Sequence, residues 1–273
     1  MSFVCFNGEF LPADQPLFTS ANRSFKFGDG LFETIKVFKG VVLFQNFHFE
    51  RLFLGLQMLR INLPAELTSA ALISQIISLC EKNNCSDLGR VRLAAYRNDD
   101  NLCEYCIEAC AVAPAVHQWR ANLRIDLFPY SRKTMDAYAG LKSANFLPYV
   151  MAARFAEEKD LDDCILLNAD NHLCETSKAN IFLVKNGELF TPSLDQGCVS
   201  GVMRRFLIEE LKRRDYIVYQ KPLKEEDLQA ADEIFITNAI IGMKGVKAFR
   251  DRLYTSSLSA EIYNQVLAPM YGE

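Results

Sequence analysis

A lysine, a carboxylate and an arginine are the residues of this chain whose types and settings are best suited to chemistry. Lys142 precedes an apolar helical stretch, Glu175 lies five residues before an apolar run at 180–184, and Arg51 stands within His48-Phe49-Glu50-Arg51-Leu52. Pyridoxal phosphate requires a lysine that forms a Schiff base, an acid at the pyridine nitrogen and a cation at the phosphate. Each residue alone is better explained as a solvated surface charge. Together they predict pyridoxal phosphate as the cofactor.

The composition indicates an ordinary globular enzyme. The chain has 273 residues, of which 50% are hydrophobic and 23% charged, with a net charge of −4. Acids and bases are mixed along the chain, so we expect no nucleic-acid partner. No uncharged run is long enough to span a membrane, so we expect no membrane partner either. We expect a small-molecule amino substrate.

The N-terminus and the cysteines favour a cytoplasmic location. Residues 1–5 lack a basic segment followed by a long apolar stretch, so we expect no signal peptide. The nine cysteines are scattered, and the CxxC at Cys103 and Cys106 has no partner CxxC. We interpret these two, with Cys110, as small core residues of a strand, and we predict no metal site.

The first part of the chain alternates strands and helices, which favours an α+β domain. Periodicity predicts a hairpin at 3–10 and helices at 47–60, capped by Asn46, and at 68–82. Further strands are predicted at 32–37, 91–95, 105–112 and 123–127. An aperiodic stretch around Trp119 leads us to place the boundary between domains 1–117 and 118–273.

The second part of the chain also contains both helices and strands. Helices are predicted at 145–159, 201–214, 225–230 and 258–270, with strands at 163–167, 180–184, 189–191, 216–219 and 233–237. A turn at Asn186-Gly187 joins two of these strands into a hairpin.

Taken together, these motifs resemble the class IV, or fold-type IV, pyridoxal-phosphate enzymes. That family includes branched-chain aminotransferases, D-amino-acid aminotransferases and aminodeoxychorismate lyase. The resemblance runs from Phe27 to about Val246. It implies an α/β (α+β) fold of two domains with the cofactor in the cleft between them, and a homodimer.

The resemblance also implies roles for single residues. Lys142 matches the Schiff-base lysine, Glu175 the acid that pairs with the pyridine nitrogen, and Arg51 the phosphate-binding arginine. His48 matches a structural position in the same motif, and we assign no catalysis to it. The other cofactor-binding residues that the resemblance implies are Asn180, Val202, Met203, Thr237 and Asn238.

Two departures from the aminotransferase patterns favour the lyase branch. Branched-chain aminotransferases place a tyrosine after the lysine motif, where this chain has Phe146 after Asn145. D-amino-acid aminotransferases use an Arg-x-His carboxylate clamp, whereas here Arg97 is followed by Asn98-Asp99-Asp100-Asn101.

The stretches 191–204 and 231–239 are most similar to the lyase. This similarity implies conversion of 4-amino-4-deoxychorismate to 4-aminobenzoate and pyruvate, a step of folate biosynthesis. Arg97 is our candidate for binding a substrate carboxylate. A class IV aminotransferase acting on branched-chain or D-amino acids is the alternative. A non-catalytic scaffold is a remote one, because such a protein would be expected to lose Lys142 or Glu175.

Overall fold

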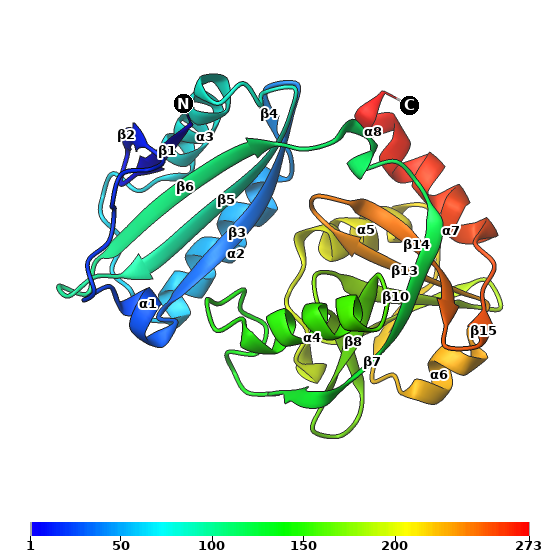
Figure 1. Ribbon diagram of the computed structural model, residues 1–273. Helices are drawn as coiled ribbons and strands as arrows, with labels where there is room; N and C mark the ends of the chain where they lie inside the picture. Colours follow the sequence, from blue (N-terminus) through cyan, green and yellow to red (C-terminus); the bar gives the residue numbers. More distant parts are fainter. Residues whose placement is uncertain (1, 273) are drawn as a thin grey trace. The chain divides into compact units, whose positions relative to one another are not determined.

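The computed structural model describes residues 2–272, which form two compact units (Figure 1). The first unit takes in the chain up to Val116 and the short segment Leu141–Asn145. The second takes in His117–Gly140 and the chain from Phe146 onward. The sequence assigns Lys142 to the second domain, but the structure groups its segment with the first. Backbone hydrogen bonds to a strand of the first unit, described below, are the reason.

The first unit is an antiparallel sheet covered by helices. The sheet has six strands in the order β2-β1-β6-β5-β3-β4. Its elements along the chain are β1 (Phe3–Phe6), β2 (Glu9–Pro12), α1 (Arg23–Phe27), β3 (Gly30–Phe38), β4 (Val41–Val42), α2 (Gln45–Met58), α3 (Ser69–Lys82), β5 (Leu88–Arg97), β6 (Cys103–Ala111) and the 3-10 turn η1 (Pro114–Val116). The helices α2 and α3 lie against one face of this sheet (Figure 1).

The hydrophobic core of the first unit lies between that sheet face and the two helices. It joins buried side chains of β3 and β5, such as Ile35 and Leu93, to Leu52 of α2 and Ile76 of α3. The apolar residues of the helices face this core. Thr68 caps α3, where its hydroxyl accepts a hydrogen bond from a backbone N–H of the first turn.

Some local predictions for the first unit are wrong. The predicted helix cap at Asn46 is not formed, because α2 begins after Phe44, which adopts a left-handed conformation with φ 55°. The helix α1 was not predicted. Cys103 and Cys106 are buried in β6 as expected, but Cys110 is exposed.

The second unit contains a nine-stranded mixed sheet. Eight strands follow the order β12-β11-β10-β13-β14-β7-β8-β9, and β15 pairs with β14. Its elements are β7 (Ala121–Lys133), α4 (Leu147–Glu158), β8 (Asp163–Asn168), β9 (Leu173–Thr176), β10 (Asn180–Lys185), β11 (Glu188–Pro192), the 3-10 turn η2 (Leu194–Gln196), α5 (Val202–Arg213), β12 (Val218–Lys221), α6 (Glu225–Ala230), β13 (Glu233–Asn238), β14 (Gly242–Phe249), β15 (Arg252–Leu253), α7 (Ser257–Ile262), the π-helical η3 (Tyr263–Leu267) and α8 (Ala268–Tyr271). Within this unit, α4 lies against β7 and β8 (Figure 1).

Two of the strands that the sequence misses, β9 and β14, share one property. All four residues of β9 are buried, and β14, which lies between β13 and β7, is buried along most of its length. A strand buried on both faces shows no alternation of apolar and polar residues, so it gives no period-two signal. The mixed α/β class of the fold is confirmed. None of the helices among residues 2–272 combines the length and apolar character needed to cross a membrane.

Candidate active site

Lys142 is held against β3 by its own backbone. The Phe32 N–H donates to the Lys142 carbonyl at 2.9 Å, and the Ala144 N–H donates to the Gly30 carbonyl at 2.9 Å. The lysine side chain is partly exposed, and its Nζ lies 4.5 Å from the centre of the Phe32 ring. The pairing fixes the base of the side chain.

Arg51 is anchored by a buried carboxylate on β3. Its Nε donates to Glu33 Oε1 at 2.7 Å and its Nη2 to Glu33 Oε2 at 2.5 Å. His48, on the same helix, contacts Glu33 Oε2 through Nδ1 at 2.7 Å. Arg51 is 15% exposed and Glu33 only 2%. The guanidinium is therefore fixed along one edge by a two-pronged, charge-assisted pair.

The charges in this cluster are set by burial and by the arginine. Burial would raise the pKa of Glu33, but the Arg51 charge and the His48 and Arg51 hydrogen bonds outweigh it and lower that pKa to about 2. Burial is also the main reason that the pKa of His48 is lowered, with smaller contributions from Arg51 and Lys142. His48 is therefore neutral near pH 7 and acts as a structural partner of Glu33, the role that its motif implies.

Glu175 lies on β9 in the second unit and has a different set of partners on each oxygen. Its Oε1 accepts hydrogen bonds from Lys133 Nζ at 2.5 Å, Tyr149 Oη at 2.7 Å and the Val199 N–H at 2.9 Å. Its Oε2 has one long contact, 3.4 Å, from the Asn180 amide. Such a carboxylate, buried and tied down by one oxygen, is suited to pair with a protonated ring nitrogen through the other.

Four of the predicted cofactor-binding residues lie beside one another in the second unit. Asn180 on β10 pairs directly with Thr237 on β13. Gly201 precedes α5, whose first residues are Val202 and Met203, and provides no side-chain cap to that helix start. The first N–H groups of an uncapped helix are suited to bind a phosphate.

Two details of this region fit a phosphate ligand. Thr237 Oγ1 is buried and has no hydrogen-bond partner within residues 2–272. A Cβ at Gly201 would lie 1.8 Å from Asn180 Oδ1, so an alanine there would displace the Asn180 side chain. Glycine thus lets Asn180 lie directly against the start of α5, and the buried Thr237 hydroxyl, which lacks a partner among residues 2–272, is suited to meet a phosphate.

Asn238 and Arg97 have partners inside the protein. The Asn238 amide donates to the Lys178 carbonyl at 3.0 Å, and its Oδ1 accepts from the N–H groups of Ile240 and Ile241. Its side chain therefore stabilises the turn after β13. A phosphate contact with Asn238 could come from its backbone or from the second N–H of its side-chain amide.

Arg97 uses all five of its guanidinium N–H groups within the first unit. Nε and Nη2 contact the Asp29 carboxylate at 2.9 and 3.4 Å. The remaining N–H groups donate to the carbonyls of Leu59 and Arg60 and to the Asn101 side chain. Five donors are the full complement of an arginine. A substrate carboxylate would have to displace one of these acceptors.

The sequence interpretation missed Glu33, Lys133 and Tyr149. Glu33 gives a weak signal, because it is a lone acid between apolar residues of a predicted strand. Lys133 gives none, because β7 is predicted to end at residue 127 and extends to 133 only through an irregular pairing with β8. Tyr149 occupies a normal apolar position of the α4 helix.

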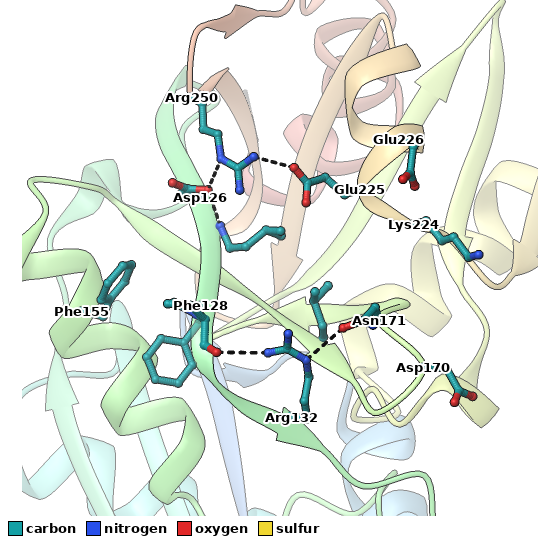
Figure 2. Close-up of a pocket in the computed structure, with 13 residues that line it drawn as sticks. Asp126, Phe128, Arg132, Phe155, Asp170, Asn171, Lys224, Glu225, Glu226 and Arg250 are labelled. Carbon is teal, nitrogen blue, oxygen red and sulfur yellow. Dashed lines mark hydrogen bonds and ion pairs between the residues drawn. The ribbon is translucent and has the colours of Figure 1, made fainter.

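A separate depression of about 550 Å³ lies on the surface of the second unit (Figure 2). None of the predicted site residues lines it. On its lining, Arg250 contacts Asp126 at 2.8 Å and Glu225 at 2.5 Å, and Arg132 donates to Asn171 at 3.3 Å (Figure 2). The predicted chemistry therefore belongs elsewhere.

Comparison with known proteins gives the family. The model of class IV amino-transferases matches residues 30–249. An aminodeoxychorismate lyase from Vibrio harveyi is 30% identical over 82% of this chain and 84% of its own. A protein named as a branched-chain-amino-acid aminotransferase from Methanocaldococcus jannaschii is 28% identical over 95% and 92%. The chain belongs to the class IV aminotransferase family, as its motifs predicted.

Solved structures show the same fold. A branched-chain aminotransferase from Thermoproteus uzoniensis matches with a TM-score of 0.89 at 22% identity, covering 99% of this chain and 95% of its own. A protein named as 4-amino-4-deoxychorismate lyase from Legionella pneumophila matches with a TM-score of 0.82 at 25% identity, covering 93% and 95%. Enzymes of this class depend on pyridoxal phosphate, so the predicted cofactor is confirmed, and the buried residues described above fit it.

Proposed function

We propose that Lys142, Glu175, Arg51 and the start of α5 serve one pyridoxal phosphate. Lys142 carries the cofactor and later moves protons, and Glu175 holds the proton on the pyridine nitrogen. Arg51, the N–H groups of Val202 and Met203, and the Thr237 hydroxyl bind the phosphate. The cofactor, when bound, withdraws electrons from the carbon beside the substrate amine.

We propose further that the reaction is the lyase reaction on 4-amino-4-deoxychorismate. The observation that supports this proposal is the end of β5. A D-amino-acid aminotransferase would need its clamp for the substrate carboxylate at this place. Arg97 is fully engaged there, and the following turn is closed by Asn98, whose side chain accepts from the N–H groups of Asp100 and Leu102. The turn carries the exposed acids Asp99 and Asp100, which would repel a carboxylate that approached it.

The lyase reaction depends less on a clamp that binds a carboxylate beside the reacting amine. Its reacting amine is on a ring, and the carboxylates of the substrate lie further from that amine than an α-carboxylate does. Lys142 would remove the proton from the ring carbon that bears the amine, and pyruvate would leave as the ring becomes aromatic. Because Arg97 is engaged within the protein, we do not assign the substrate carboxylates to it.

Transamination of branched-chain or D-amino acids is the second candidate. It is supported by the archaeal relative named as a branched-chain enzyme, which is 28% identical over 95% of this chain. The position after Asn145 argues against that activity. The Phe146 ring lies stacked on Tyr149, with centroids 4.2 Å apart, and offers no hydroxyl to a cofactor.

The two functions give different products. Cofactor-loaded protein is incubated with 4-amino-4-deoxychorismate, and 4-aminobenzoate and pyruvate are quantified by chromatography. In parallel, leucine, valine or D-alanine is supplied with 2-oxoglutarate. We expect 4-aminobenzoate and pyruvate in equal amounts and little transfer of the amino group. Rapid transamination without 4-aminobenzoate would establish the second candidate instead.

The lysine assignment is tested on the same protein. Borohydride reduction of the loaded enzyme, followed by peptide mapping, should place the cofactor on Lys142. Lys142→Ala should lose the product and the visible absorbance of the bound cofactor. Lys212→Ala, which changes an exposed lysine on α5, is the matched control and should retain both. Reduction that labels a different lysine would overturn the assignment.

A further inference from the structure

Lys133 is a buried lysine that no role proposed so far explains. It is the last residue of β7, and its side chain is only 8% exposed. A buried ammonium group is costly unless a charge and hydrogen-bond acceptors compensate it. A lysine is retained in such a place only where its partners hold it.

Its partners form a closed triangle with Glu175. Lys133 Nζ donates to Glu175 Oε1 at 2.5 Å and to the Tyr149 hydroxyl. That hydroxyl in turn donates to the same Oε1 at 2.7 Å. The lysine also lies over the Tyr149 ring, 4.9 Å from its centre. Each member therefore contacts the other two. The arrangement holds the Glu175 carboxylate in place and compensates its negative charge.

The triangle distinguishes the two oxygens of Glu175. Oε1 accepts three hydrogen bonds, the third from the Val199 N–H, whereas Oε2 has only the 3.4 Å contact with Asn180. A ring N–H that approaches Glu175 would meet Oε2. The positive charge of Lys133 competes with that N–H for the charge of the same carboxylate.

We propose that Lys133 is a positioning residue that sets how strongly Glu175 retains the proton on the pyridine nitrogen of the cofactor. The proposal rests on the proposed pairing of Glu175 with that nitrogen. Lys133, assisted by Tyr149, holds Oε1 so that Oε2 is left for the ring, and its positive charge partly offsets the negative charge that the ring N–H meets. The electron-withdrawing power of the cofactor is thereby set below what an unpaired glutamate would give.

The test observes the ring nitrogen directly. The protein is loaded with pyridoxal phosphate labelled with ¹⁵N in the ring, and the nitrogen chemical shift is followed across pH. Lys133→Met should raise the proton affinity of the ring nitrogen by about tenfold or more, since an adjacent charge changes a pKa by about one to three units. Lys133→Arg keeps the charge and should stay near the wild type.

Two further variants keep the result interpretable. Tyr149→Phe removes one donor from Glu175 Oε1 and should also raise the proton affinity of the ring nitrogen, but by less than Lys133→Met. It can be measured even if the Lys133→Met protein is too unstable to bind the cofactor. If Glu175→Gln changes the nitrogen titration but neither the Lys133→Met nor the Tyr149→Phe variant does, the proposal for Lys133 is overturned. If Glu175→Gln changes nothing, the pairing of Glu175 with the ring is wrong, and the proposal falls with it.

Discussion

The buried Glu33 carboxylate should make the unfolding free energy of the first unit depend on pH, by an amount that follows from its pKa. Its pKa is lowered from 4.5 to about 2 in the folded protein, despite burial, by the Arg51 charge and the His48 and Arg51 hydrogen bonds. A carboxylate with a depressed folded pKa contributes stability above its unfolded pKa, and that stability is lost as the pH falls toward the folded value. The difference between 4.5 and about 2 corresponds to about 3 kcal/mol of unfolding free energy at pH 7.

Glu33→Gln removes this contribution while keeping the shape of the side chain. We expect the variant to be less stable than wild type by about 3 kcal/mol at pH 7 and by about 2 kcal/mol at pH 3.5. Comparing the two proteins at each pH cancels the titration of all other acids. Below pH 3.5 the difference should continue to shrink toward pH 2.

The assay must separate the two units. Urea unfolding followed by far-ultraviolet circular dichroism reports both, whereas fluorescence of the single tryptophan, Trp119, reports the second unit. The effect should appear only in the dichroism transition. Glu66→Gln, at an exposed site of the first unit, is the control and should change stability little at either pH. A wild-type advantage that is the same at both pH values would refute the account of Glu33.

The other predictions concern retention of the cofactor and are measured by titrating pyridoxal phosphate into each variant. Arg51→Ala should weaken binding by roughly 10- to 100-fold, because it removes a charge-assisted contact with the phosphate. Thr237→Val should weaken it by roughly threefold to tenfold, the effect of one neutral hydrogen bond; unchanged affinity would show that its buried hydroxyl does not meet the phosphate. Gly201→Ala should reduce affinity, because its Cβ would displace the side chain of Asn180, whose Oδ1 lies 1.8 Å from that position; an alanine variant that binds normally would show that cofactor binding does not need the Asn180 side chain in this place.

The sequence predicts well those elements that have one solvent-exposed face and one buried face. The α6 helix is predicted with its observed bounds, and α3 is predicted to begin one residue before its observed start at Ser69. The hairpin turn at Asn186-Gly187 is also correct, with φ of 52° and 78° at the two residues. These features depend on contacts between residues close in the chain, which leave a periodic pattern or a turn signature.

The surroundings of the site could not be predicted in the same way. Glu33 and Arg51 are 18 positions apart, and Lys133 and Glu175 are 42 apart. Such pairings depend on strand order, which no periodic pattern records. Family resemblance identified Lys142, Glu175 and Arg51 as candidates, but it carried no information about the residues that hold them. It also suggested a substrate role for Arg97, whose donors the structure assigns to Asp29 and its neighbours.

The grouping of residues 141–145 with the first unit bears on how this protein could be cut into fragments and on how it could evolve. Leu31 and Ser143 form a β-bridge, so the lysine-bearing segment belongs with β3, although the chain on either side of it belongs to the second unit. A cut between Val116 and His117 would leave Lys142 on one fragment and its supporting strand on the other. Neither fragment expressed alone would present the lysine as the whole chain does. Recombination that swaps a domain at that boundary would exchange the strand but not the lysine that it supports.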